Sequence, residues 1–387
     1  MFRKTYVKID NKVLTNNVKE IISTYNNYKY YFGVVKANAY GHGDYVVNDL
    51  IKGGINYLAV SSLEEAISIR NYNKEIPILC LEPIDLSYIK EIQDNDVTIT
   101  IEDIEYVKKL LDLKLTKELK VHLKLDTGMS RLGFTNKEEL EEALRLLKEN
   151  KNILLEGIYT HIATSGISDI YYDKQISTFE YLTKDINLKE IPIVHIGRSM
   201  TLVNHPKLEC VNGVRLGICM YGFNNSIPTP TGLRKIKRDR LLKKLNISET
   251  KLTNNLNLKT AFTLYTEVMS IRKIKKGSFV GYGAGYIANE DIIVATLPIG
   301  YVDGMSKSMK YVSINNTKYN IIGEICMDMT MIKIDDTVKL HDKVEIFGNN
   351  ITIKEVSRNI GTNAYHVLTR ITTRVPRVYD NDKEIKY

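Results

Sequence analysis

The feature that most constrains the fold is an alternation of short apolar runs with amphipathic stretches over the first 220 residues. The stretches begin with helix-start signals, such as the capping box at Ser62–Glu65 and Asn136 before a run with leucines on one face. Eight strand–helix units predict an α/β fold whose first domain is a closed (β/α)8 barrel of the TIM type. The runs are Tyr31–Val35, Tyr57–Val60, Ile76–Leu81, Val97–Ile101, Val121–Leu125, Leu154–His161, Ile191–Ile196 and Val214–Met220.

The pattern changes after the eighth run. The segment Phe223–Asn257 contains two prolines and a basic stretch, which predicts a linker or insertion with one short basic helix. From Ala261 the apolar residues alternate with a period of two, as in short strands, and two helices and an edge strand close the chain. We therefore expect a barrel domain over residues 1–222, the segment 223–257, and a mostly-β domain over 258–387.

The elements expected in the second domain are short. The strands are Leu264–Val268, Ser278–Val280, Ile292–Leu297, Lys318–Ile322, Met331–Ile334 and Lys343–Ile346, the helices are Ile353–Asn359 and Thr362–Arg370, and the last strand is Arg374–Tyr379. Two domains also suit a chain of 387 residues, because single cores stop growing well below that length.

Most of the net charge of +8 comes from one short segment of the chain. Between Arg234 and Lys244 lie seven basic residues and one acid, so the rest of the chain is close to neutral. One basic segment is more typical of a solvated face than of a nucleic-acid surface, and we expect no nucleic-acid partner.

The apolar runs and the cysteines indicate in which compartment of the cell the protein is expected. The apolar runs are too short to span a membrane, and the first residues lack the apolar core of a signal peptide. Cys80, Cys210, Cys219 and Cys326 are scattered without a Cys-x-x-Cys pair, which argues against a zinc site and a disulfide framework. We expect a cytoplasmic protein without a membrane partner and without a metal.

Lys36 follows the first apolar run directly, in the sequence VVKANAYGHGD over residues 34–44. Desolvation at the end of a strand lowers the pKa of a lysine, and a neutral amine attacks carbonyl groups. Gly41 and Gly43 allow the backbone to approach an anion closely. The segment favours a lysine bound covalently to pyridoxal phosphate (PLP), beside part of a phosphate loop. A strand-end lysine that extends to solvent is the alternative.

Further polar residues fall at the carboxyl ends of the expected strands, where barrels of this type carry their chemistry. They are Lys124, Arg131, His161, Ser199 and Arg215. Each of them alone has a structural alternative, a surface ion pair or a satisfied core group, but their coincidence on one face favours a site.

Several separated motifs give the chain a close resemblance to bacterial alanine racemases, in the order of that family and over nearly the whole chain. After the lysine motif come HLKLDTGMSRLG (122–133), EGIYTH (156–161), VRLGI (214–218), GYGAGY (281–286), LPIGYVDG (297–304), GEICMD (323–328) and RVPR (374–377). The resemblance implies a cytoplasmic, PLP-dependent homodimer with shared active sites that interconverts L- and D-alanine for peptidoglycan synthesis.

The resemblance implies two bases on opposite faces of the cofactor. Lys36 would carry PLP covalently and serve the D-isomer, and Tyr282 of the second subunit would serve the L-isomer. His161 and Arg215 match the residues that connect to this tyrosine, and their positive charge would lower its pKa. Arg215 would also face the pyridine nitrogen of the cofactor and keep it unprotonated, which limits side reactions.

The resemblance also implies which residues bind the phosphate of the cofactor and the substrate. The phosphate would be bound by Tyr40, Ser199, Tyr365 and the backbone of Gly217 and Ile218. The substrate carboxylate would be bound by Arg131 and by the backbone of the partner's Met327, with Tyr301 and Tyr365 narrowing the pocket to a methyl group. Lys124 matches a lysine that many members of the family carry as a carbamate, an anion that would hold Arg131.

Two departures bear on substrate range and assembly. Arg198 stands where the family usually has asparagine near the ring hydroxyl of the cofactor, and the segment 223–257 is longer than the family's. A serine or broad-specificity racemase on the same scaffold is the main alternative, although Tyr301 and Tyr365 both favour a small side chain.

Two further PLP classes fit less well. Barrel-type decarboxylases carry a glycine-rich phosphate loop and a catalytic cysteine motif, whereas no Gly-Gly-Gly occurs here and Cys326 stands in another context. Single-barrel PLP-binding proteins lack a β-domain and therefore lack a counterpart of Tyr282.

Overall fold

The computed structural model describes residues 3–164, 169–223 and 256–380, with positions 232, 233, 236, 237, 240 and 243. The chain divides into two compact units. The barrel unit comprises Thr15–Ala39 and Asp44–Leu258, and the sheet unit comprises Met1–Leu14, Tyr40–Gly43 and Lys259–Tyr387. Most of the predicted segment 223–257, including its basic run, lies outside the described residues.

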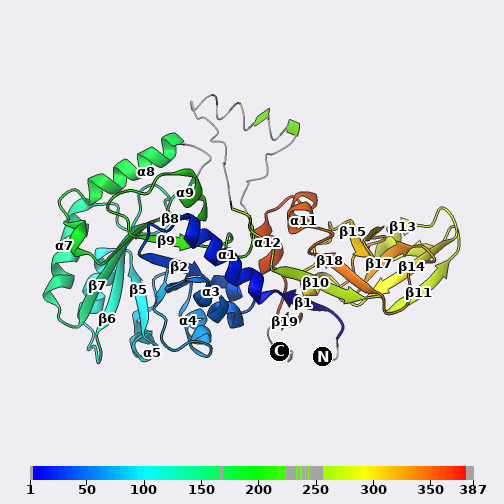
Figure 1. Ribbon diagram of the computed structural model, residues 1–387, viewed down its shortest axis with the longest axis horizontal. Helices are drawn as coiled ribbons and strands as arrows, with labels where there is room; N and C mark the ends of the chain where they lie inside the picture. Colours follow the sequence, from blue (N-terminus) through cyan, green and yellow to red (C-terminus); the bar gives the residue numbers. More distant parts are fainter. Residues whose placement is uncertain are drawn as a thin grey trace. The chain divides into compact units, whose positions relative to one another are not determined.

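The barrel unit confirms the predicted eight-stranded parallel barrel (Figure 1). Each strand pairs in parallel with the next, and the last closes on the first, with Phe32 opposite Arg215. The strands are buried on both faces, as the fully buried β5 illustrates, which is why they appear in the sequence as continuous apolar runs. They are β2 (Tyr30–Val34), β3 (Tyr57–Val60), β4 (Ile78–Cys80), β5 (Val97–Ile101), β6 (Leu119–Leu125), β7 (Ile153–Thr160), β8 (Ile193–Arg198) and β9 (Gly213–Leu216).

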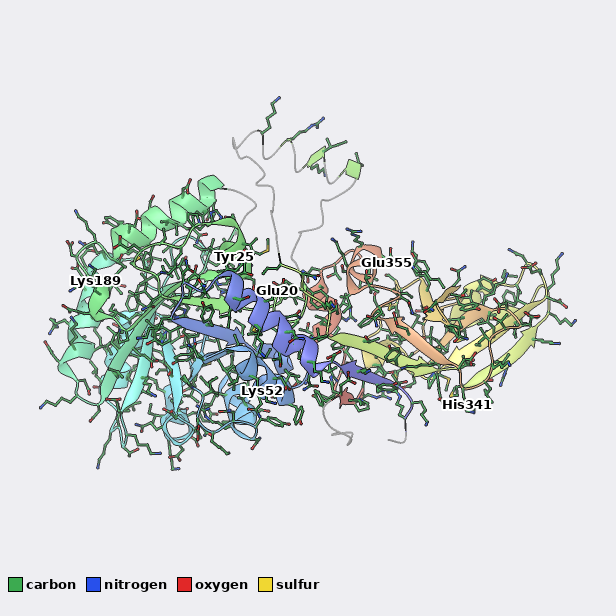
Figure 2. All side chains as sticks on the ribbon, viewed as in Figure 1. Glu20, Tyr25, Lys52, Lys189, His341 and Glu355 are labelled. Carbon is green, nitrogen blue, oxygen red and sulfur yellow. The ribbon has the colours of Figure 1, made fainter. Side chains whose placement is uncertain are left out.

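The helices of this half of the chain follow the predicted signals. The side chains of Ser62 and Asn136 accept hydrogen bonds from the backbone N–H groups of Glu65 and Glu139, and so begin two helices where the sequence predicts them. Charged side chains such as Lys52 and Lys189, both labelled in Figure 2, are exposed on the surface of the unit. The helices are α1 (Asn11–Thr24), α2 (Lys36–Tyr40), α3 (Val47–Gly53), α4 (Leu63–Arg70), α5 (Ile89–Asp94), α6 (Ile104–Leu111), α7 (Lys137–Glu149), α8 (Asp169–Leu182) and α9 (Ser199–Asn204). No helix among the described residues combines the length and apolarity needed to cross a bilayer.

The sheet unit is rich in strands, as predicted. Its six-stranded sheet has the order β16-β15-β18-β10-β1-β19, beside a three-stranded sheet β11-β14-β17 and a hairpin β12-β13. Burial alternates along β10 and β17, which explains their period of two. The strands are β1 (Tyr6–Ile9), β10 (Phe262–Glu267), β11 (Ser270–Ile274), β12 (Phe279–Val280), β13 (Tyr286–Ile287), β14 (Ile292–Leu297), β15 (Tyr311–Ile314), β16 (Thr317–Asn320), β17 (Thr330–Ile334), β18 (Lys343–Phe347) and β19 (Arg377–Tyr379), and the helices are α11 (Ile353–Asn359) and α12 (Ala364–Thr369).

The first strand corrects the predicted start of the barrel domain at residue 1. β1 pairs antiparallel with β10 and parallel with β19, so the N-terminal strand belongs to a sheet built otherwise from residues after 261. Pairing between strands more than 250 residues apart leaves no local signal in the sequence. The predicted edge position of the last strand is confirmed, because β19 ends the sheet order.

The Gly-His-Gly loop is shaped by packing in the sheet unit. Gly41 has a φ of +81°, and a Cβ atom there would lie 2.5 Å from the carbonyl oxygen of Leu368. Arg377 of β19 donates from Nε to the carbonyl oxygen of Gly41 at 2.9 Å. Glycine is therefore required at position 41 by the close approach of α12 as well as by its backbone angle.

This requirement gives the first testable prediction. Gly41→Ala should destabilise the protein by about 1–3 kcal/mol more than Gly361→Ala, because only the first substitution adds a clash to the unfavourable backbone angle. Gly361 is the matched control, since it also has a positive φ (+71°) but no atom within 4 Å of an added Cβ. Urea unfolding followed by circular dichroism measures both, and equal losses would contradict the close packing at Gly41.

Candidate active site

The predicted site residues of the barrel unit lie at the carboxyl ends of its strands. In a parallel barrel these ends meet on one face, so the fold brings the residues together. Lys36 follows β2, Lys124 is near the end of β6, Arg131 lies in the next loop, His161 follows β7, Arg198 ends β8, Ser199 begins α9, Arg215 lies in β9, and Gly217 and Ile218 follow it.

Lys36 is followed by a turn of left-handed backbone conformation that the sequence pattern does not predict. Ala37, Asn38 and Ala39 have φ angles of 54°, 54° and 49°, and Tyr40 has 53°. Such angles cost about 1–2 kcal/mol per non-glycine residue. The carboxylate of Glu65 helps to hold the turn by accepting from the N–H of Ala37 at 2.7 Å. Strain of this kind, placed next to a lysine at a barrel mouth, is typical of a functional site.

Lys124 is a buried amine that forms no direct ion pair within the described part of the chain, although the charge of Asp126 acts to raise its pKa. It is only 3% exposed, its Nζ donates to the carbonyl oxygen of Leu125 at 3.2 Å, and it lies 5.3 Å from the ring centre of Tyr159. No carboxylate among the described residues forms an ion pair with it. Burial, reinforced by the charges of Arg215 and Arg131, lowers the pKa of Lys124 to about 8. At pH 7 the amine is therefore still mostly charged, with about a tenth of it neutral, far more than for an ordinary lysine.

The loop after β6 presents Arg131. Asp126 accepts hydrogen bonds from the backbone N–H groups of Gly128, Ser130 and Arg131, at 2.9, 3.0 and 2.7 Å. Gly133, with a φ of +118°, passes so close to β6 that an added Cβ would lie 2.6 Å from the carbonyl oxygen of Lys124. The Asp-Thr-Gly-Met-Ser-Arg motif thus forms a fixed loop. The guanidinium of Arg131 is exposed and has no acceptor in the described part of the chain, so it is free to bind a carboxylate.

Arg215 is buried in the barrel, 3% exposed, and almost fully hydrogen-bonded. Its Nη1 donates to Nδ1 of His195 at 2.6 Å and to the backbone oxygen of His195 at 3.1 Å. Its Nη2 donates to the backbone oxygens of Thr160 at 2.7 Å and Ile196 at 3.1 Å. Among the described residues no acceptor faces Nε. This leaves one N–H of a fixed cation for a ligand atom that accepts a hydrogen bond.

His161 is held neutral by its surroundings. Burial and the nearby cations Arg215 and Arg198 lower its pKa well below the usual value. Its Nδ1 lies 3.4 Å from Nη2 of Arg215, a position suited to an acceptor. His161 therefore has its other ring nitrogen available as a donor.

Ser199 and the backbone after β9 form a small polar cluster. The Oγ of Ser199 accepts from the N–H of Gly217 and from Sγ of Cys219, both at 3.0 Å. Ser199 and Ile218 are buried. The hydroxyl hydrogen of Ser199 has no acceptor among the described residues and is a donor of the kind that binds phosphate, whereas the N–H of Gly217 is already bonded to Ser199.

The sheet unit carries the remaining predicted residues. The rings of Tyr40 and Tyr365 pack against each other, with centroids 5.6 Å apart. The segments of Tyr301 and Met327 are joined by a hydrogen bond from the N–H of Val302 to the carbonyl oxygen of Met327 at 3.1 Å. Tyr282 is 69% exposed, in a turn between two glycines with positive φ, and Met327 is 52% exposed.

Three residues next to Arg215 were not predicted as site residues. His195 contacts Arg215 directly, His122 contacts His195, and Glu156 contacts His122. His122 and Glu156 lie inside the motifs quoted from the sequence. A signal for them exists, because polar residues in strands otherwise buried on both faces need partners.

Comparison with known proteins places this geometry in a family. Residues 9–225 match the alanine racemase N-terminal domain family, and residues 261–379 match the alanine racemase C-terminal domain family. An alanine racemase of Methanococcus maripaludis is 32% identical over 388 residues, covering 97% of this chain and 98% of the relative. The chain belongs to the alanine racemase family. The prediction of an isomerase of this family is thereby confirmed.

Solved structures of the alanine racemase family agree with the fold. The alanine racemase from E. faecalis superimposes with a TM-score of 0.88 at 32% identity, covering 98% of each chain. A histidine racemase from Leuconostoc mesenteroides superimposes with a TM-score of 0.84 at 25% identity, covering 98% of each chain. The fold thus also occurs with a racemase named for a larger amino acid.

The unpaired amine of Lys124 gives a prediction with a definite sign. Below pH 8 the lysine is charged in both the folded and unfolded states, so the folded state bears the full cost of a buried cation. Between pH 8 and 10.5 the unfolded state binds more protons than the folded state at this lysine. The contribution of Lys124 to the free energy of unfolding therefore rises with pH over this range. Lys124→Met should therefore be more stable than the parent protein at pH 7, by about 3 kcal/mol. This advantage should disappear above pH 10.5.

Urea unfolding in carbon dioxide-free buffer at pH 7 and pH 10.5 measures this difference, because effects of all other groups cancel between the two proteins. Lys120→Met is the matched control on the same strand, since Lys120 is partly exposed and paired with Asp96. A difference in stability between the two proteins that stays the same at pH 7 and pH 10.5 would show that the pKa of Lys124 is not lowered in the folded state.

Proposed function

We propose that this chain is a PLP-dependent racemase that interconverts L- and D-alanine with two bases, Lys36 and Tyr282 of the partner subunit. The observation that carries the proposal is Arg215: a cation fixed in the barrel with one N–H left for a ring nitrogen that carries no proton. Family membership and the row of predicted residues at the barrel mouth support it. The proposed role in the cell is to supply D-alanine for peptidoglycan in the cytoplasm.

The donors present suit this cofactor. Lys36 would hold PLP covalently, Arg215 would face its ring nitrogen, and its phosphate would be bound by Ser199, Gly217 and Ile218, with the hydroxyls of Tyr40 and Tyr365. When bound, PLP withdraws electrons from the α-carbon of the substrate, which makes the α-proton removable by a side chain. A guanidinium at the ring nitrogen keeps that nitrogen unprotonated and restrains this withdrawal, which favours proton exchange over other outcomes.

The proton transfers fall to Lys36 and Tyr282. The amine of Lys36 would take or return the α-proton on one face, as the base for the D-isomer, and the phenolate of the partner's Tyr282 would do so on the other, as the base for the L-isomer. His161 and Arg215 would contribute here, because the neutral imidazole can donate a hydrogen bond to the phenolate and the cation lowers the pKa of a nearby tyrosine.

Substrate binding would rest on Arg131 and the groups around it. Its exposed guanidinium would bind the carboxylate of the amino acid, with the backbone N–H of the partner's Met327. The low pKa of Lys124 favours the neutral amine that reacts with carbon dioxide, so we propose a carbamate there. This modification would replace an unpaired cation by an anion that holds Arg131. Tyr301 and Tyr365 would restrict the side-chain pocket.

Exposure of two predicted residues supports a dimer with shared sites. Tyr282 and Met327 are 69% and 52% exposed, which is high for residues expected to touch a substrate. A second copy of the chain would use them to complete its own site.

A broader amino-acid racemase is the second candidate. The structural neighbour named as a histidine racemase favours it, as does Arg198, an additional cation at the end of β8. Arg198 donates from Nη2 to the carbonyl oxygen of Ala163 at 3.3 Å.

The third prediction tests the reaction. PLP-loaded protein should convert either enantiomer of alanine to a racemic mixture and exchange its α-proton with solvent deuterium. Chiral chromatography should be run on alanine, serine, histidine, lysine and arginine in parallel. Rates highest for alanine support the proposal, whereas preference for a larger amino acid would favour the second candidate. Absence of racemisation for every substrate would overturn both.

The fourth prediction tests the two bases and the shared site. Tyr282→Phe should lose most deuterium exchange into L-alanine while retaining the visible absorption of bound cofactor, because the hydroxyl alone is removed. Loss of cofactor binding would instead make Tyr282 structural. Tyr286→Phe is the matched control, because Tyr286 belongs to the same motif and has no role in the proposed reaction.

Mixing Lys36→Ala and Tyr282→Phe subunits sharpens this test. If each site combines Lys36 of one subunit with Tyr282 of the other, half of the sites in a mixed dimer are intact. A statistical mixture should then recover about a quarter of the parent activity. No recovery after confirmed subunit exchange would contradict a shared site.

A further inference from the structure

A continuous chain of polar side chains runs through the core of the barrel unit behind Arg215. Nη1 of Arg215 lies 2.6 Å from Nδ1 of His195, and Nε2 of His195 lies 2.9 Å from Nδ1 of His122. Nε2 of His122 lies 3.1 Å from Oε2 of Glu156, which also accepts from the hydroxyl of Tyr57 at 2.6 Å. Both histidines are fully buried. The chain links strands β9, β8, β6 and β7.

The chemistry of arginine fixes the direction of every hydrogen bond in this chain. A guanidinium can only donate, so Nδ1 of His195 must accept, and the proton of His195 must lie on Nε2. That N–H donates to Nδ1 of His122, whose own proton must then lie on Nε2. This N–H donates to the carboxylate of Glu156. Both histidines are therefore neutral, because an additional proton on either would place two N–H groups against each other.

The surroundings fit this assignment. Burial lowers the pKa of both His195 and His122, and the charge of Arg215 acts in the same direction. Glu156 acts to raise the pKa of His122, but burial outweighs it. Burial acts to raise the pKa of Glu156, but hydrogen bonds from His122 and Tyr57 outweigh it and keep that pKa below its usual value. Glu156 is thus a carboxylate at one end of a chain whose other end is a cation.

Packing holds the central residue in place. The ring of His195 stacks between Phe32 and Tyr159, with centroids at 4.6 and 4.5 Å and interplanar angles of 14° and 13°. The two aromatic rings fix the plane of the imidazole. The hydrogen bonds to Arg215 and His122 then decide which ring nitrogen faces Arg215.

We propose that Glu156, His122 and His195 form a one-way hydrogen-bonded relay that positions Arg215 and keeps its Nε–H directed at the ligand. They are positioning residues, since none of them takes part in the proton transfers. This inference rests on the proposed function, because it assigns the relay to the arginine that faces the ring nitrogen of PLP. The relay accounts for two histidines buried in the barrel strands and for the glutamate bonded to one of them.

The fifth prediction concerns the tautomers, which are independent of activity. In the full-length protein as purified, labelled with ¹⁵N-histidine, His195 and His122 should both be neutral at pH 7 with the proton on Nε2. His195→Phe and His122→Phe assign the signals by their loss. Glu156→Gln, which keeps the shape but removes the charge, should shift the ring nitrogens of both histidines. A proton on Nδ1 of either residue, or an imidazolium, would overturn the relay.

The same variants test what the relay does for Arg215. His195→Phe keeps the stacked ring but removes the side-chain acceptor of Arg215 Nη1, which then retains only the backbone oxygen of residue 195. We expect kcat for alanine to fall about tenfold. KM should change much less, because Arg131 binds the carboxylate. The absorption band of the bound cofactor should also shift. His195→Gln should recover part of kcat, since an amide offers both an acceptor and a donor.

A matched control separates positioning from general loss of a buried polar group. Thr183→Val removes a buried hydroxyl of the barrel unit that donates to the backbone oxygen of Phe179 and has no contact with the relay among the described interactions. If kcat and the absorption band respond to His195→Phe and Glu156→Gln no more than to Thr183→Val, the positioning role is wrong. If the parent protein racemises no amino acid, the proposed function fails, and the nitrogen spectra still decide whether the relay exists.

Discussion

The structure of the barrel mouth depends on one buried cation, the guanidinium of Arg215. Removing a charge from water costs several kcal/mol unless hydrogen bonds replace the lost hydration. Here backbone oxygens from β7 and β8 and the ring of His195 replace it, and no carboxylate among the described residues contacts the guanidinium directly. No negative charge of the described residues therefore lies in direct contact with the guanidinium, and its positive charge lowers the pKa of neighbouring cationic groups.

Several properties of the site follow from this charge. The pKa of His161 falls well below its usual value and that of Lys124 falls to about 8, through burial first and through Arg215 next. Together with Arg131 and Arg198 the site is a concentration of cations, with Asp126 occupied by the backbone of its own loop. Such a field favours an anionic ligand, and a phosphate and a carboxylate are the anions that the proposed reaction brings.

The site also combines rigid and strained parts. Arg215 and Lys124 lie within strands, whereas Lys36 opens a left-handed turn and Arg131 lies in a loop tied by Asp126. Rigid strands suit groups that must keep a fixed orientation, and the strained turn places a reactive lysine where regular structure would not. Tyr282, exposed on the sheet unit, supports the proposal that a second copy of the chain completes the chemistry.

The sequence by itself determined the barrel, the strand-rich second unit and the family, because apolar periodicity is local and the motifs stand in a fixed order. It also located Lys36, Lys124, Arg131, His161, Ser199 and Arg215 at strand ends. Only the tertiary structure decided that β1 joins a sheet of late strands, that residues 37–40 are left-handed, and that His122, His195 and Glu156 stand behind Arg215. These features arise from contacts between residues distant in the chain, which periodicity and spacing do not encode.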